Sequence, residues 1–176
     1  MILKPQDLVV LLKLVALGSQ GWTFQRLAVE LSISQSEVHA AVRRVVAASL
    51  MTQASSAGRP VRAALLEFLV HGAKYAFPPK RGELTRGVPT GYAAPPLDKL
   101  IGGSSEPPPV WPYAEGKVRG YALAPLYRSV PEAALRDPAL YELLALVDAI
   151  RDGRARERSL ARQAIEQRLG KARRDG

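Results

Sequence analysis

Residues 24–45, FQRLAVELSISQSEVHAAVRRV, read as two helices joined by the short corner Ser32-Ile33-Ser34. Thr23, just before the stretch, is a favoured N-cap for the first helix. Ser34 is placed to cap the second helix, and Glu37 follows three residues on, as in a capping box. Apolar residues recur at helical spacing in both helices: Leu27, Ala28, Leu31, Val38, Ala41, Val42 and Val45. The stretch therefore predicts a helix-turn-helix.

The second helix of this pair has two faces. Packing explains the apolar face, but it does not explain the polar face. That face carries Gln35, Ser36, His39 and Arg43. A helix that reads the DNA major groove needs short polar and basic groups at this place, because they reach base edges and phosphates. Gln35 can bond an adenine edge, and Arg43 a guanine or a phosphate. The alternative is an ordinary packed helix pair with a solvated outer face.

The chain from residue 5 to about residue 61 resembles the winged helix-turn-helix of the MarR-type bacterial transcription regulators. The matching stretches are WTFQRLAVELSISQSEVHAAVRRVVAASLM (22–51) and ASSAGRPV (54–61). The resemblance implies a homodimer joined by N- and C-terminal helices, with two recognition helices in successive major grooves of a palindromic operator. It also implies that Arg59 is a wing-tip residue near the minor groove. The predicted DNA-binding residues are Thr23, Ser34, Gln35, Ser36, His39, Arg43, Arg44 and Arg59.

The formal charge of +9 favours a polyanionic partner such as double-stranded DNA. Residues 1–80 hold nine Lys/Arg against four Asp/Glu, and residues 151–176 again hold nine against four. Residues 81–150 hold seven against eight, so the basic charge lies at the two ends. A solvated surface that is merely basic is the alternative interpretation.

The first predicted helix runs from about Pro5 to Leu17, with Gly18 as its stop, and it is apolar nearly all round. Such a helix needs burial on more than one side, either by the C-terminal half of the chain or by a second subunit. The apolar run at residues 8–18 is too short to span a bilayer and contains Lys13. No signal peptide is recognised, and there is no cysteine, so we expect a cytoplasmic protein.

The segment that follows changes character twice. Residues 51–61 predict a short hairpin or a loop, and a helix is expected from Pro60 to about His71, ended by Gly72. Residues 72–129 are rich in Pro and Gly but also in aromatic residues, which favours an ordered strap packed on a helical body. The stretch 81–96 within it, which holds Arg81, Arg86 and Tyr92, is either a ligand- or partner-binding loop or part of this strap, and we favour the strap.

Short strands are expected at residues 110–113 and 117–123, joined by a turn at Glu115-Gly116, and residues 102–109 are the best candidate for a flexible segment. Two helices then close the chain, one capped by Asp137 and the other, basic, from about residue 154 to 169. The expected fold is mainly α: a winged helix-turn-helix region (1–74), a Pro/Gly-rich middle with few short strands (75–129) and a C-terminal helical region that contributes to the dimer contact (130–176).

Reactive groups are sparse, with two histidines, His39 and His71, and no carboxylate at metal-ligand spacing. We therefore expect no enzyme, no metal and no cofactor. The main functional hypothesis is a sequence-specific transcription regulator that acts as a homodimer. Two alternatives stay open. One is an antitoxin-like or adaptor module that binds a partner protein through the aromatic middle and regulates its own operon. The other is a non-specific architectural DNA binder.

Overall fold

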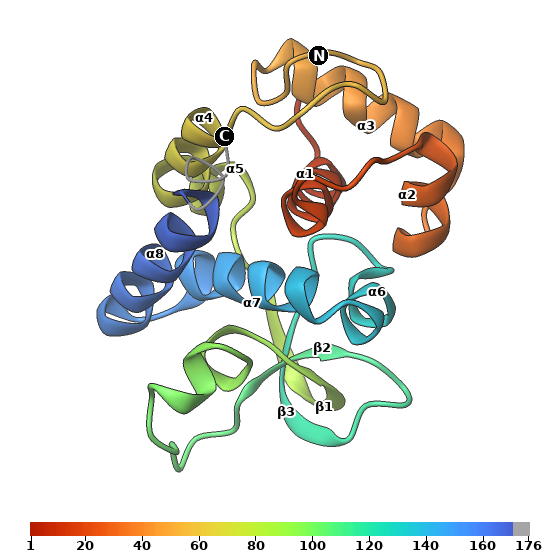
Figure 1. Cartoon of the computed structure of the whole chain (residues 1–176). Coiled ribbons are helices and arrows are strands. Elements are labelled where there is room, and N and C mark those ends of the chain that lie inside the picture. Colours follow the sequence, from red (N-terminus) through yellow and green to blue (C-terminus); the bar gives the residue numbers. More distant parts are fainter. Residues whose placement is uncertain (171–176) are drawn as a thin grey trace.

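The computed structural model describes residues 1–170 and shows a mainly α-helical chain with one small sheet (Figure 1). The N-terminal helices α1 (Pro5–Leu17), α2 (Phe24–Leu31) and α3 (Gln35–Ala47) lie on one side of the long helix α7 (Pro138–Asp152), and the sheet lies on the other side. Helix α7 is therefore the middle layer of the molecule. It is buried over most of its length because both neighbouring layers cover it.

The helices α2 and α3 begin and end close to where the sequence predicts. Thr23 Oγ1 accepts a hydrogen bond from the N–H of Arg26 at 3.0 Å, and Ser34 Oγ accepts one from the N–H of Glu37 at 3.2 Å. Ser32, in the corner between them, takes the left-handed conformation with φ of 53°, which usually favours glycine. Its hydroxyl accepts a hydrogen bond from Arg136 at 2.7 Å, which ties the corner to the C-terminal part of the chain.

Helix α1 is buried within its own chain. Residues Leu8 to Leu12 have no exposed surface, and α1 contacts α2, α3 and α7. The sequence left open whether the rest of the chain or a second subunit covers this apolar helix. In the structure, the chain itself covers it. Its burial gives no reason to place α1 at a subunit interface.

The segment after α3 folds back as a bridged loop. Met51 and Pro60 form an antiparallel bridge, and the N–H of Thr52 donates to the carbonyl of Arg59 at 3.0 Å. The helix that follows is longer than predicted: α4 (Arg62–Glu67) continues through a π-helical turn, η1 (Phe68–Gly72), into α5 (Ala73–Ala76).

Gly72 was predicted to stop this helix, and that prediction is wrong. A Cβ at Gly72 would lie 2.9 Å from Cδ2 of Phe68. The glycine therefore makes room for the Phe68 ring inside the helix instead of ending it.

The sheet consists of β1 (Arg81–Pro89), β2 (Pro109–Pro112) and β3 (Val118–Leu123), and each strand pairs with both others. Strand β1 runs antiparallel to β2 and to β3, whereas β2 and β3 are parallel. The two predicted strands are confirmed, but the hairpin between them is wrong. The stretch 81–96, expected as a loop or strap, instead opens with the longest strand of the sheet. Its exposure does not alternate along the strand, so the period-two signal was missing.

Glycines explain how so small a sheet closes. Gly87 of β1 pairs with Pro112 of β2 and also with Val118 of β3, so the connection between β2 and β3 crosses β1 at this point. A Cβ at Gly87 would overlap the Trp111 carbonyl, and one at Gly116 would overlap the backbone of Gly87. The glycines of this Pro/Gly-rich segment are thus what allows three backbones to approach closely.

Helix α6 (Val130–Arg136), which was not predicted from the sequence, precedes α7, and α8 (Ala155–Gly170) closes the described chain. Asp137 caps α7 as predicted, since its Oδ1 accepts from the N–H of Leu140 at 3.1 Å. Residues from the predicted regions 1–74, 75–129 and 130–176 contribute to one continuous hydrophobic core. Within residues 1–170, no helix has the length and apolar character needed to cross a membrane.

Candidate nucleic-acid interface

The outer face of α3 carries four of the predicted DNA-binding residues. Gln35, Ser36, His39 and Arg43 are all exposed, whereas Val38, Ala41, Val42 and Val45 of the same helix are buried. The spacing of the four follows successive turns of the helix, so they form one stripe beginning at its N-terminus. The structure therefore brings these four together on one surface.

His39 is held in place by an aromatic neighbour from α2. Its ring lies 3.7 Å from the ring of Phe24, measured between centroids, with an angle of 11° between the two planes. The stack covers one face of the imidazole, while the residue as a whole stays exposed. Phe24 in turn meets Trp22 edge-on at 5.2 Å. His39 is thus held by Phe24 on the same exposed face of α3 as Gln35 and Ser36.

Thr23 and Ser34 have structural partners. Each accepts the hydrogen bond that caps the helix after it, and Ser34 Oγ also lies 3.2 Å from Ser36 Oγ. Both residues are exposed, so a cap and a phosphate contact can share the same helix N-terminus. Their first role, however, is to set where α2 and α3 begin.

Arg44 does not lie on the exposed stripe. Its guanidinium binds the fully buried carboxylate of Asp7 in a bidentate manner, with Nε 2.9 Å from Oδ2 and Nη2 2.8 Å from Oδ1. Nη2 also lies 2.9 Å from Glu37 Oε1, which accepts a further hydrogen bond from Gln6. The prediction that Arg44 faces DNA therefore has to be corrected, because two carboxylates turn its side chain inward against α1.

The same contacts set the charges in this cluster. Hydrogen bonds from Gln6 and Arg44 lower the pKa of Glu37, and the hydrogen bond to Asp7 raises the pKa of Arg44. Glu37 and Arg44 are therefore both ionised at neutral pH. The cluster, which we call the Asp7 clamp (Asp7, Arg44 and Glu37), fixes α3 against the first turn of α1.

Arg59 lies in the bridged loop of residues 51–60, where the resemblance places a wing. Its side chain is exposed, but Nη1 donates to the carbonyls of Ser56 and Gly58. The guanidinium is therefore bound to the backbone of its own loop. The indole of Trp22 donates to the same Gly58 carbonyl at 3.0 Å. This bond connects the loop to the start of α2, near the stripe on α3.

Lys4 is a neighbour of the stripe that the sequence did not indicate. Lys4 and Arg43 line one shallow depression between the N-terminal residues and α3, together with Ala40. Lys4 is exposed, and its place beside Arg43 comes from the docking of α1 on α3. Since α1 is apolar and buried, nothing in its sequence pattern places a cation next to α3.

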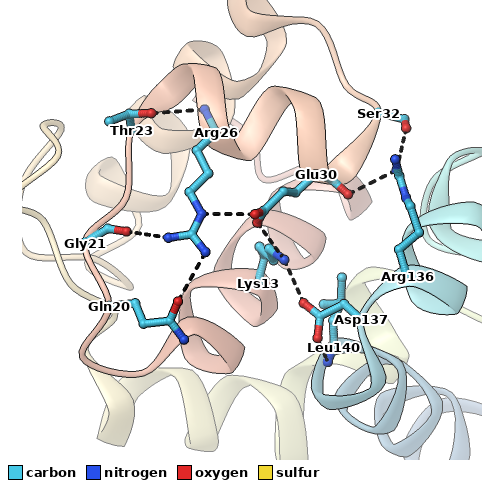
Figure 2. A network of polar contacts seen from close by, with 10 residues as sticks. All are labelled: Lys13, Gln20, Gly21, Thr23, Arg26, Glu30, Ser32, Arg136, Asp137 and Leu140. Atoms are coloured by element: carbon cyan, nitrogen blue, oxygen red, sulfur yellow. Dashed lines mark hydrogen bonds and ion pairs between the residues drawn. The ribbon is translucent and has the colours of Figure 1, made fainter.

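A second polar cluster joins α2 to the C-terminal helices (Figure 2). Lys13 of α1 is almost fully buried, and its Nζ lies 2.9 Å from Glu30 Oε2 and 2.6 Å from Asp137 Oδ2. Arg26 binds Glu30 from the other side at 3.0 Å. Figure 2 shows Arg136 reaching the corner of the helix pair, where it bonds Ser32 and the Glu30 carbonyl. The cluster therefore joins the helix pair to α6 and α7.

The carboxylates of this cluster stay charged although they are partly buried. Burial raises the pKa of Glu30, but hydrogen bonds from Lys13 and Arg26 outweigh it, so the net pKa is lowered. The pKa of Asp137 is likewise lowered, because the bonds from Lys13 and the N–H of Leu140 outweigh burial. Lys13 interrupts the apolar run in the sequence. Its charge is thus balanced by two carboxylates, Glu30 and Asp137.

The stretch 81–96 contributes to a cavity of about 310 Å³ on the other side of α7. Arg81, Tyr92 and Tyr121 line it beside Asp152, and Arg81 Nε lies 2.7 Å from Asp152 Oδ1. Burial raises the pKa of Tyr92, and nearby Glu157 and Glu106 act in the same direction. The cations and carboxylates around this cavity largely pair with one another. The cavity therefore favours neither an anionic nor a cationic ligand.

Among residues 1–170, no group of three or more His, Asp or Glu side chains could hold a metal ion. Comparison with protein-family models, with curated proteins and with solved structures finds no significant match.

Proposed function

We propose that this protein is a sequence-specific DNA-binding transcription regulator that reads the major groove with α3. The observation that carries the proposal is the exposed stripe of Gln35, Ser36, His39 and Arg43 on a helix whose opposite face is buried. These side chains have the donors and acceptors that base edges require. The short corner before α3 and the exposed N-terminus of this helix support the same role, because a helix N-terminus favours a phosphate.

The distribution of paired and unpaired cations also supports α3 as the helix that faces DNA. Lys13, Arg26 and Arg44 bind carboxylates within the fold, and Arg62 donates to carbonyls at the end of α8. Lys4 and Arg43 remain exposed at the edge of α3. Among residues 1–62, these two exposed cations thus adjoin the proposed reading face.

A homodimer on a palindromic operator is part of the proposal. One helix of this kind covers one half-site, and two copies double the length of sequence that is read. Since α1 is covered by its own chain, the two copies would meet through another surface. Sedimentation velocity at micromolar concentration checks this part: a monomer alone and on DNA would exclude it, without affecting the reading role of α3.

The direct experiment begins with selection of bound sequences from a randomised duplex library, followed by affinity measurements on the selected site. We expect Arg43→Ala and Gln35→Ala each to weaken binding to that site by about 1–3 kcal/mol and to relax the preference at one base pair. Arg128→Ala and Gln163→Ala are matched controls, because both residues are exposed and lie outside α3. Their affinity should equal that of the unchanged protein.

The outcomes separate three functions. Loss of preference in the α3 variants alone supports sequence reading. Equal binding of all duplexes, with a steep salt dependence, indicates a non-specific DNA binder. Absence of an enriched sequence together with absence of duplex binding at low salt contradicts the proposal.

A further inference from the structure

A basic cleft lies between the helix η1–α5 and the helix α8, away from the proposed reading face. Its volume is about 180 Å³, and its described lining is Val70, His71, Lys74, Ile150, Arg158 and Arg162. Four of these six side chains are basic, and none is a carboxylate. The cleft therefore differs from the cavity beside Arg81, where cations and carboxylates alternate.

The four basic groups face one another from two elements. His71 and Lys74 lie three residues apart on η1–α5, and Arg158 and Arg162 lie four residues apart on α8. Such spacings place each pair on one helix face, so two rows of basic side chains meet across the cleft. Arg162 uses Nε for an ion pair with Glu166 at 2.9 Å, outside the cleft lining. Like charges arranged in this way repel each other unless an anion lies between them.

The floor of the cleft is apolar. Ile150 of α7 is buried, and Val70 is half-buried. An apolar floor lowers the local dielectric response and strengthens the attraction of an anion to the surrounding cations. A water molecule takes about 30 Å³ in the liquid, so the cleft has room for about six water-sized groups. A phosphoryl group, with one phosphorus and three oxygens, fits this size.

We propose that this cleft binds a phosphoryl group, held by Lys74 and Arg158 from opposite walls with His71 and Arg162 beside them. Arginine provides a planar pair of donors for two phosphate oxygens, and lysine adds a compact positive charge. The group has two sources with the same chemistry: a small phosphorylated ligand or a backbone phosphate of DNA. Only the second source rests on the proposed function.

The experiment has one arm for each source. In the first, inorganic phosphate and pyrophosphate are titrated into the full chain at low ionic strength, followed by calorimetry and by amide chemical shifts. We expect the shifts to concentrate at residues 70–74 and 158–162. Lys74→Gln and Arg158→Gln should each weaken binding about tenfold or more, because each removes a charge-assisted hydrogen bond. In the second arm, the same variants are measured with a random-sequence duplex across a salt series.

Matched controls remove the same charge elsewhere. Lys117→Gln and Arg156→Gln are suitable, because Lys117 and Arg156 are exposed and do not line the cleft. Thermal unfolding of all four variants shows whether the fold is retained. Since Lys74 is half-buried, Lys74→Arg, which keeps the charge, serves as a second variant there and should retain binding.

Weaker pyrophosphate binding in the cleft variants alone supports the proposal and assigns a small ligand. Weaker duplex binding, with a salt slope reduced by about 0.9 for each lost contact, supports it and assigns the DNA backbone. Equal behaviour of cleft and control variants with both probes, or no binding of either probe, overturns it. The first arm contains no DNA, so it can succeed or fail independently of base reading by α3.

Discussion

Two buried carboxylates, one in each half of the molecule, hold the fold in different ways. Asp7 has no exposed surface and receives the guanidinium of Arg44 together with the N–H of Lys4. Asp148 of α7 is 1% exposed and accepts hydrogen bonds from Thr90 at 2.7 Å, Trp111 at 2.7 Å and Arg151 at 2.8 Å. Asp7 thus joins two helices, whereas Asp148 joins the sheet and the turn after β1 to α7.

The two sites differ in which carboxylates remain beside the arginine if the charge of Asp7 or of Asp148 is removed. Arg44 keeps a second carboxylate, Glu37, and its side chain is 11% exposed. Arg151 pairs only with Asp148 among residues 1–170, and its side chain is 5% exposed. Burial raises the pKa of Asp148, and the attraction of Arg151 and the three hydrogen bonds oppose that effect. The centre around Asp148 therefore depends on one charge, while the Asp7 clamp shares its charge among three groups.

The largest effect is expected from Asp148→Asn. The new amide would direct its N–H₂ group at one of the side chains that donate to Asp148. It would also leave Arg151 buried without its counter-charge. We expect a loss of about 3–5 kcal/mol in the free energy of unfolding, measured by urea titration. Asp98→Asn is the control, since Asp98 is exposed and should change stability by less than about 0.5 kcal/mol. Similar losses in both variants would mean that Asp148 is not a special centre.

A smaller effect is expected from Asp7→Asn, at about 2–3 kcal/mol, because Glu37 still neutralises Arg44. The clamp also predicts coupling: the loss for Asp7→Asn combined with Arg44→Gln should be smaller than the sum of the two single losses by 1 kcal/mol or more. A double-mutant cycle from urea unfolding measures this. Additive losses would show that the two side chains stabilise the fold separately.

The same comparison shows how far the sequence could lead. Helix starts follow from local rules, and Thr23, Ser34 and Asp137 cap the helices that they were predicted to cap. The inward turn of Arg44 does not follow from such rules. Arg43 and Arg44 are adjacent, and spacing alone cannot show that a buried Asp7 lies opposite one of them. This depends on how α1 docks, which is a tertiary contact.

The sheet shows the limit more clearly. Gly87, Gly116 and Gly120 lie where a Cβ would overlap backbone atoms of another segment. In the sequence such glycines look the same as turn glycines, so β1 was interpreted as a loop or strap. Likewise, Asp148 lies in an apolar helical stripe, and its donors Thr90 and Trp111 come from 58 and 37 residues away. Contacts at that separation have no periodic signature in a single sequence.

Lys13→Met tests the cluster that joins the two halves, and we expect a loss of about 1–2 kcal/mol at neutral pH. The loss is smaller than at Asp7, because Glu30 is 34% exposed and 22% of the Asp137 side chain is exposed, so water can replace Lys13 in part. Urea unfolding measures the loss, and Lys117→Met, at an exposed site, is the control. An unchanged or higher stability would mean that desolvation of Lys13 cancels its two ion pairs.

The pH dependence of that loss has a definite sign. The folded pKa values of Glu30 and Asp137 are lowered, so below about pH 5 the unfolded chain binds protons more readily. Their stabilising contribution is therefore present above the unfolded pKa values of about 4 and is lost as the pH falls through the folded values. The difference between the unchanged protein and Lys13→Met should shrink in acid. Asp148 has a raised pKa and the opposite sign, but it is common to both proteins and cancels.

The smallest effect on stability is expected from Arg43→Ala, beside the buried Arg44. Arg43 is exposed, and no ion pair of its side chain is seen within residues 1–170, so its removal should change the free energy of unfolding by less than about 0.5 kcal/mol. Arg44→Ala should cost several times more, because it leaves Asp7 buried with only the N–H of Lys4. Urea unfolding of the two variants, with DNA affinity measured on the same samples, separates the roles. A destabilised Arg43→Ala protein would mean that this residue serves the fold, and the loss of DNA binding expected for it would no longer indicate base contact.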